Sequence, residues 1–231
     1  MKKAAILFLL IISSSIRAQQ KNEFTLQAGN NLSLHDLRLR PYNNSKILSF
    51  NDFGISILYN HKIKGHLYFS TIFNLSILET DKKDIVKYWQ SAGVNLKSAK
   101  GGTYKMFNFL CGLKYYIIVG EKFNLASSLR GGIVKMNVSD IVFTDDYLPG
   151  YTKESYNFKN TWSVNSDIEF TYLLSKTIGL TFDVSYLSQK FKYDYKFDHE
   201  YGNNQYYNYG IPDKKMIADQ VLMYLGLKYC F

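Results

Sequence analysis

The sequence predicts an all-β fold, an eight-stranded antiparallel up-and-down β-barrel that crosses a membrane. Three observations support this prediction. The 231 residues include 20 Tyr and 16 Phe but only 3 Pro, a composition typical of strands rather than helices. Eight stretches alternate apolar and polar residues, so that each would present one apolar and one polar face. The connections between them alternate long and short, which is typical of membrane barrels with short periplasmic turns and long extracellular loops.

The chain begins with the features of a secretory signal peptide. Met1–Lys3 is basic, Ala4–Ile12 is apolar, and the small residue Ala18 lies where cleavage is expected. The apolar run is too short for a membrane helix, which needs about 20 such residues. We therefore predict a signal peptide over residues 1–18 and a single β-barrel domain over residues 19–231.

The eight alternating stretches define the expected strands. They cover residues 24–34, 48–60, 66–77, 107–117, 123–133, 161–172, 178–189 and 221–231. Short turns are expected at residues 61–65, 120–122 and 175–177. The long connections, expected to be extracellular loops, cover residues 35–45, 79–102, 139–159 and 191–218. Ten barrel strands are the alternative, if residues 79–102 or 139–159 contain a further hairpin.

The last stretch, Val221–Phe231, is the clearest strand in the sequence. Its apolar residues alternate with a set that includes a charge, and it ends on an aromatic residue. Together with Gln27–Ser33 in the first strand, it resembles the small outer-membrane β-barrel domain family, often called porin-like, similar in architecture to the eight-stranded OmpA and OmpX type barrels. The resemblance implies a bacterial outer-membrane location, with outer-membrane lipid and the barrel assembly machinery as partners. It also implies that Tyr229 and Phe231 belong to a C-terminal assembly signal.

Aromatic residues at both ends of the expected strands indicate which face meets lipid. They share the apolar face of their own strands, as the two aromatic girdles of a membrane barrel do. They are Phe24, Tyr59, Phe69, Tyr115, Phe123, Tyr172, Tyr229 and Phe231 near the short turns and termini, and Phe53, Phe107, Trp162 and Tyr186 near the long connections. A soluble lipocalin-like barrel, with its apolar face inside, is the alternative.

The opposite face of the later strands carries three cations and three anions. They are Lys114, Arg130, Asp167, Glu169, Asp183 and Lys228. The interior of an eight-stranded barrel is only wide enough for side chains, and unpaired charges there would be costly. We therefore predict a lumen filled by a network of paired charges. A proton or ion path through the lumen is the alternative.

The last long connection is rich in tyrosine, interleaved with Asn, Gln and charged residues. The tyrosines are Tyr193, Tyr195, Tyr201, Tyr206, Tyr207 and Tyr209. Tyrosine supplies a large amphipathic contact area at low entropic cost, as in binding loops. These residues are therefore a candidate loop binding surface for an extracellular or envelope protein. Alternatively, they extend the strands above the membrane and pack as a rigid hairpin.

No pattern in the sequence indicates catalysis, a cofactor or a metal site. The four His lie in expected loops or at an expected turn, with His66 directly after the turn at residues 61–65, and the motifs of zinc proteases, P-loops and serine hydrolases do not occur. Cys111 and Cys230 are expected to be free thiols. The net charge is +9, but the basic residues are scattered along the chain and mixed with acidic ones, which argues against nucleic-acid binding. We predict a non-enzymatic outer-membrane barrel for envelope structure or surface interaction, and a narrow pore or small-solute channel as the alternative.

Overall fold

The computed structural model describes residues 22–33, 52–79, 82–91, 96–145, 151–200 and 206–231. The predicted signal peptide, residues 1–18, and the expected loop at residues 35–45 lie outside these ranges. The described residues contain no helix that is both long enough and apolar enough to cross a membrane.

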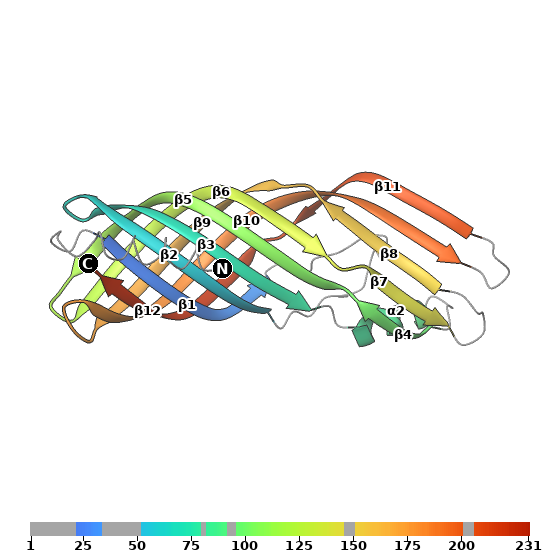
Figure 1. The fold of residues 1–231 in the computed structure, drawn as a ribbon, viewed down its shortest axis with the longest axis horizontal. Coiled ribbons are helices and arrows are strands. Elements are labelled where there is room, and N and C mark those ends of the chain that lie inside the picture. The colour runs from blue at the N-terminus through green and yellow to red at the C-terminus, as the bar shows by residue number, and fades with distance from the viewer. Residues whose placement is uncertain (1–21, 34–51, 80–81, 92–95, 146–150, 201–205) are drawn as a thin grey trace, which may run out of the picture.

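Eight strands of the described chain close into one antiparallel ring (Figure 1). In ring order they are β1 (Asn22–Ser33), β2 (Asp52–Lys64), β3 (Leu67–Glu79), β5 (Thr103–Val119), β6 (Phe123–Val138), β9 (Thr161–Leu173), β10 (Ile178–Glu200) and β12 (Gln220–Cys230). The ring closes where β1 pairs with β12, in a register that runs from Glu23 opposite Cys230 to Ser33 opposite Gln220. The predicted eight-stranded up-and-down barrel is confirmed.

A second sheet extends from the end of the barrel opposite the short turns. Its strand order is β11 (Tyr206–Ile217), β10, β8 (Tyr151–Phe158), β7 (Ile141–Asp145) and β4 (Leu96–Gly101). Strand β10, with 23 residues, belongs to both the barrel and this sheet. Helix α2 (Lys82–Ser91) lies beside β4 (Figure 1).

The two expected loops at residues 139–159 and 191–218 are therefore largely strands. Strands β7 and β8 do form a hairpin, but it pairs with the upper part of β10 outside the ring, so the alternative of ten barrel strands is wrong. The physical reason is that the period-two alternation of burial continues along β10 beyond the barrel, which keeps one face of the strand buried and the backbone extended.

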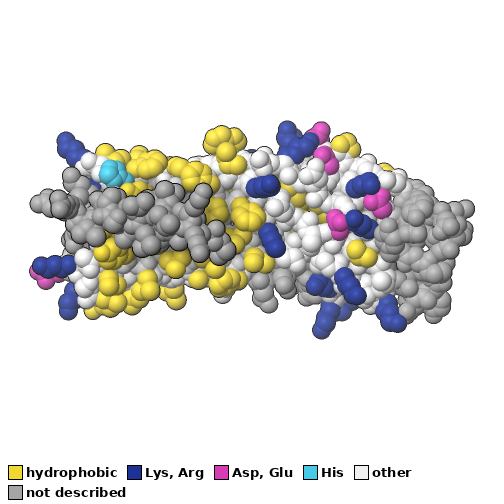
Figure 2. Space-filling model, in the orientation of Figure 1, with side chains coloured by type: hydrophobic (Ala, Val, Ile, Leu, Met, Phe, Trp, Pro, Cys, Tyr) yellow, Lys and Arg dark blue, Asp and Glu magenta, His cyan; other side chains and the backbone are white. Residues whose placement is uncertain are grey.

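The barrel strands bury their polar face and expose their apolar face. On β9, for example, Trp162 and Val164 are exposed, whereas Asn165, Asp167 and Glu169 are at most 4% exposed. The same inversion recurs around the ring, and hydrophobic side chains form a broad band over the half of the molecule near the short turns (Figure 2). A soluble lipocalin-like barrel would show the opposite arrangement, so the predicted lipid-facing orientation is the one observed.

The second sheet has an apolar core of its own, continuous with the upper end of the barrel. Side chains from five strands of the sheet and from the ends of β5 and β6 contribute to it. Among its buried members are Tyr104, Met136, Phe143, Tyr156, Phe158, Phe191, Tyr193, Tyr195 and Met216. The extracellular part of the molecule is thus a packed extension of the barrel.

Candidate functional site in the barrel lumen

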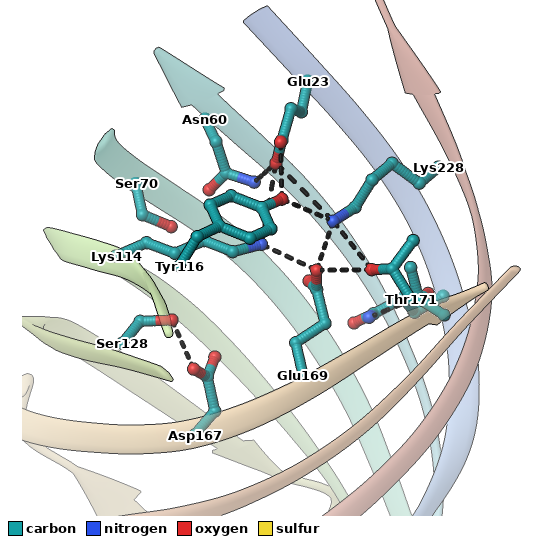
Figure 3. A network of polar contacts seen from close by, with 12 residues as sticks. Glu23, Asn60, Ser70, Lys114, Tyr116, Ser128, Asp167, Glu169, Thr171 and Lys228 are labelled. Atoms are coloured by element: carbon teal, nitrogen blue, oxygen red, sulfur yellow. Dashed lines mark hydrogen bonds and ion pairs between the residues drawn. The ribbon is translucent and has the colours of Figure 1, made fainter. Parts of the chain in front are cut away.

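The centre of the lumen network is the carboxylate of Glu169 on β9. Its Oε1 atom accepts a hydrogen bond from Lys114 Nζ on β5 at 2.7 Å and forms a second ion pair with Lys228 on β12. Both ammonium groups also lie 3.6 Å from Oε2 of Glu23 on β1. The hydroxyl of Tyr116 donates to Oε1 of Glu23 at 2.5 Å (Figure 3). Two lysines and two carboxylates therefore link four strands of the ring.

This four-charge network is almost completely removed from solvent. The side chains of Lys114 and Lys228 are 0% and 1% exposed, and those of Glu169 and Glu23 are 1% and 8% exposed. Ions so deeply buried are tolerated only when oppositely charged partners and hydrogen bonds surround them. Asn60 and Thr171 supply such hydrogen bonds, to Glu23 and to Glu169 and Lys228 respectively (Figure 3).

Arg130 on β6 forms a second ionic group with Asp167 on β9. The guanidinium also donates to Asn165 Oδ1 at 3.0 Å and to the hydroxyls of Ser70 and Ser128 at 2.8 and 2.7 Å. The side chain therefore uses several of its donors, as buried arginine requires. Ser128 in turn donates to Asp167, which locks the pair together (Figure 3).

The structure places all six of the predicted lumen charges inside the barrel, but it does not pair all of them. Five take part in ion pairs. Asp183 on β10 is 3% exposed, and its Oδ2 atom has no hydrogen-bond partner among the described residues. Sequence reasoning missed Glu23, although it lies on the polar parity of the first strand. The expected strand began only at Phe24, so this carboxylate was left out.

Two further groups of side chains lie in the lumen, beside buried polar residues such as Gln27, Ser56 and Gln189. One is centred on Tyr224, whose hydroxyl donates to Asn31 Oδ1 and accepts from Asn74 Nδ2, both at 2.7 Å. Gly54 leaves room for this phenol, since a Cβ atom there would lie 2.1 Å from the hydroxyl oxygen. The other group is an apolar cluster of buried residues: Leu58, Ile72, Leu110, Leu187 and Leu222.

A cavity of about 380 Å³ opens at the end of the barrel where the short turns lie. Glu23, Tyr68, Tyr116 and Cys230 line it, so the cavity ends at the four-charge network. Cys230 is free, and so is Cys111. Among the described residues, no group of three His, Cys, Asp or Glu could hold a metal ion.

The tyrosine-rich segment divides into buried and exposed members, which corrects the candidate binding surface. Tyr193 and Tyr195 are 1% and 3% exposed, because the inward face of β10 carries them into the apolar core. Tyr156 packs against both, with ring centroids 6.1 and 5.3 Å away. Tyr209 is exposed. Tyr201 and the side chains of Tyr206 and Tyr207 lie outside the described part.

The C-terminal aromatic pair lies at the periplasmic end of the ring. Tyr229 is 46% exposed, and its ring stacks on that of Phe231 with centroids 5.6 Å apart. The backbone of Phe231 exchanges two hydrogen bonds with Asn22, which extends the pairing of the first and last strands by one residue pair. That these two aromatic residues serve as an assembly signal stays a prediction.

No protein-family model and no curated protein sequence matches the chain. Solved structures do match. The outer membrane protein OprG from Pseudomonas aeruginosa is 12% identical, with a TM-score of 0.52 over 93% of this chain and 98% of that one. A major outer membrane protein from Thermus thermophilus is 11% identical, with a TM-score of 0.52 over 91% and 99%. AlkL, solved in lipid bilayers, is 15% identical, with a TM-score of 0.50 over 93% and 92%. At such low identity these likenesses establish the fold.

Proposed function

We propose that this chain, which has the fold of the small bacterial outer-membrane β-barrels, is a non-enzymatic barrel with a closed lumen that serves the cell envelope through its extracellular strands and loops. The observation that carries the proposal is the four-charge network of Glu23, Lys114, Glu169 and Lys228. Its members come from four strands distributed around the ring, and none is more than 8% exposed. A solute could pass only by separating these ions in a medium of low polarity.

The apolar cluster gives a second reason to regard the lumen as closed. Leu58, Ile72, Leu110, Leu187 and Leu222 come from five different strands, and each is at most 8% exposed. A water-filled path would have to run past these packed side chains, which offer no hydrogen bonds to an ion or to water. The charge network and the apolar cluster together support a lumen filled with side chains.

The extracellular sheet supports a role in surface interaction. Its strands share a packed core with the barrel, and the described parts of the β7–β8 and β10–β11 hairpins extend to the far end of the molecule (Figure 1). Loops carried by such packed strands are where binding residues are commonly found. The proposed partner is an extracellular or envelope protein. The remaining partners that we propose are outer-membrane lipid, around the apolar band, and the barrel assembly machinery, at Tyr229 and Phe231.

Planar-bilayer recording of the refolded protein tests the closed lumen. The unmodified protein should give no stable single-channel steps, because the network and the apolar cluster block the interior. The double variant Glu169→Ala/Lys228→Ala removes the centre of the network and should increase leak currents. Leu225→Ala, a change on the lipid-facing surface, is the matched control and should not. Reproducible steps from the unmodified protein would contradict the proposal.

A narrow pore is the second candidate. The cavity of about 380 Å³ at the periplasmic end favours it, because it brings solvent space as far as Glu23 and Tyr116. Such a pore would need the network to rearrange. Single-channel steps in the unmodified protein that change with Glu23→Gln would select this candidate over the closed barrel.

A further inference from the structure

Lysines stand on the outward face of the strands where the apolar band ends. On β5 and β6, Lys105 and Lys135 each lie two residues beyond a lipid-facing residue, Phe107 and Ile133. The same level of β10 carries exposed lysines. Figure 2 shows basic side chains spread over the half of the molecule beyond the hydrophobic band, some of them close to its edge. Some of the positive charge therefore lies at the extracellular membrane boundary, around part of the ring.

The densest part of this positive surface is a cluster of Lys190 and Lys192 on β10 and Lys215 on β11, called here the three-lysine cluster. Lys192 and Lys215 are directly opposite each other across the two strands, and Lys190 projects from the same face two residues away. All three are exposed. Like charges in directly opposed positions destabilise a pair of strands. The fold thus maintains a local repulsion that a bound anion would relieve.

Nearby carboxylates offset only part of the cluster's charge: the pKa of Asp213 is lowered mainly by its hydrogen bond from Lys159, and the charge of Lys192 contributes. In the described part of the chain, none of the three ammonium groups lies within ion-pair distance of an acidic side chain. The nearest acidic groups, Asp194 on β10 and Asp213 on β11, form ion pairs with Lys159, at 3.6 and 2.7 Å.

A cavity of about 600 Å³ lies beside the cluster, between the start of β9 and the middle of β10. Lys190, Lys192 and Lys159 line its polar side, and Trp162 and Val164 line its apolar side. Trp162 is 76% exposed. An indole at this level is typical of the membrane interface, where the ring is in contact with headgroups. The cavity therefore joins cationic donors to an apolar wall that continues into the lipid-facing surface.

We propose that the three-lysine cluster and the adjoining cavity bind a phosphorylated lipid headgroup of the outer leaflet. The ammonium groups supply compact positive charges for phosphate oxygens, and the indole and Val164 contact the first segment of an acyl chain. The occupant is a lipid because the site opens outward at the edge of the apolar band, where lipid is the neighbouring molecule of a membrane-embedded barrel. The inference rests on the membrane location that the proposed function includes, but not on whether the lumen is closed.

The test is binding of lipid A, a bisphosphorylated glycolipid, to the folded full chain in dodecyl maltoside micelles, followed by native mass spectrometry. Lys190→Gln/Lys192→Gln/Lys215→Gln should weaken binding by about tenfold or more, given the contribution of each lysine at an anionic surface. The matched control is Lys62→Gln/Lys64→Gln/Lys122→Gln, which removes the same charge at the opposite rim and should leave binding unchanged. Folding of each variant is checked by the heat-dependent shift in gel mobility.

Two further arms distinguish the source of the phosphate and the role of the cavity. Phosphatidylcholine should bind no more tightly to the unmodified protein than to the triple variant, and inorganic phosphate should not displace lipid A at equal concentration. Trp162→Ala should weaken lipid A binding without altering its dependence on salt, because it removes contact area and no charge.

Equal lipid A affinity in the unmodified protein and the triple variant would overturn the proposal, and would leave the lysines the role of protecting the edge strand β11 from pairing with other chains. Displacement by inorganic phosphate would overturn the lipid assignment. Because both are measured in micelles on folded protein, neither result depends on the conductance experiment that tests the proposed function.

Discussion

Substituting Glu169 by Gln would remove one negative charge from the centre of the lumen while nearly preserving the side-chain volume. In the native barrel, the two carboxylates of Glu169 and Glu23 balance the ammonium groups of Lys114 and Lys228. In Glu169→Gln the two buried lysines would keep only Glu23 as an ion-pair partner, 3.6 Å from each of them, with Asp183 on the adjacent strand opposite position 169. The site would change from neutral to a net charge of +1 in a position almost without solvent.

The expected cost is large for one conservative substitution. Removing one partner of a buried ion pair costs about 3–5 kcal/mol, because the remaining charge is left without compensation. Gln can still accept one hydrogen bond through its carbonyl oxygen, which offsets part of this loss. We expect the free energy of unfolding to fall by about 4 kcal/mol.

The assay is urea unfolding of the refolded barrel in lipid vesicles, followed by gel mobility and by tryptophan fluorescence. Adding Lys114→Met to Glu169→Gln restores a neutral site and should recover roughly half of the lost stability, which a double-mutant cycle would measure as coupling between the two residues. Asp213→Asn is the control for a charge change at an exposed ion pair. It should have no measurable effect, since Asn also tolerates the positive φ of this residue. If Glu169→Gln stayed within about 1 kcal/mol of the unmodified protein, the assigned importance of the network would be refuted.

Three further predictions concern other parts of the fold. Gly29→Val should leave little barrel with shifted gel mobility after refolding, because a Cβ atom there would lie 1.9 Å from a carbonyl oxygen of β12; normal recovery would contradict the close approach of β1 and β12. Tyr195→Ala should lower the free energy of unfolding by about 3–5 kcal/mol, whereas Tyr209→Ala, at a side chain that is 47% exposed, should change it little; equal losses would show that burial does not separate them. The hydrogen bond from Lys153 lowers the pKa of the Asp140 carboxyl below its ordinary value of 3.8. The ionised carboxylate therefore stabilises the start of β7. This stabilisation is fully present at pH values above 3.8 and is lost as the pH falls through the lowered pKa. The protection of β7 amides from hydrogen exchange should therefore fall on strong acidification of the unmodified protein, and should fall less in Lys153→Met. An equal fall in the two proteins would exclude the Asp140–Lys153 pair as the cause.

The sequence was sufficient to predict the ring because alternation of side chains is a local property. Each barrel strand carries its own apolar and polar face, so the eight strands and the inward placement of Lys114 and Asp167 follow without knowledge of their neighbours. The ends of the strands were harder to predict. The residues after Phe191 still alternate, but Asn, Asp and Gly among them are typical of loops, and the continuation of β10 was therefore missed.

The pairing of the lumen charges could not be predicted, because it depends on the stagger between strands. Arg130 pairs with Asp167 on the adjacent strand, whereas Lys114 on β5 reaches Glu169 two strands away in the ring. Which of these side chains come within ion-pair distance depends on the register and tilt of the closed barrel, and no single strand specifies either. Glu23 was missed because the expected first strand began at Phe24, and its role appears only when the closed ring brings Lys114 and Lys228 to the same level.

The pairing of β1 with β12 has a consequence for biogenesis. These strands come from opposite ends of the described sequence, so no shorter nascent segment can complete the cylinder. Until the final strand arrives, β1 and β10 both present rows of unsatisfied amide and carbonyl groups, which are templates for misassembly with other chains. Contacts between such distant positions also form slowly, because the long intervening chain must first be ordered. A truncated chain that ends before Gln220 would therefore have to be kept from aggregating by chaperones and then be degraded by proteases.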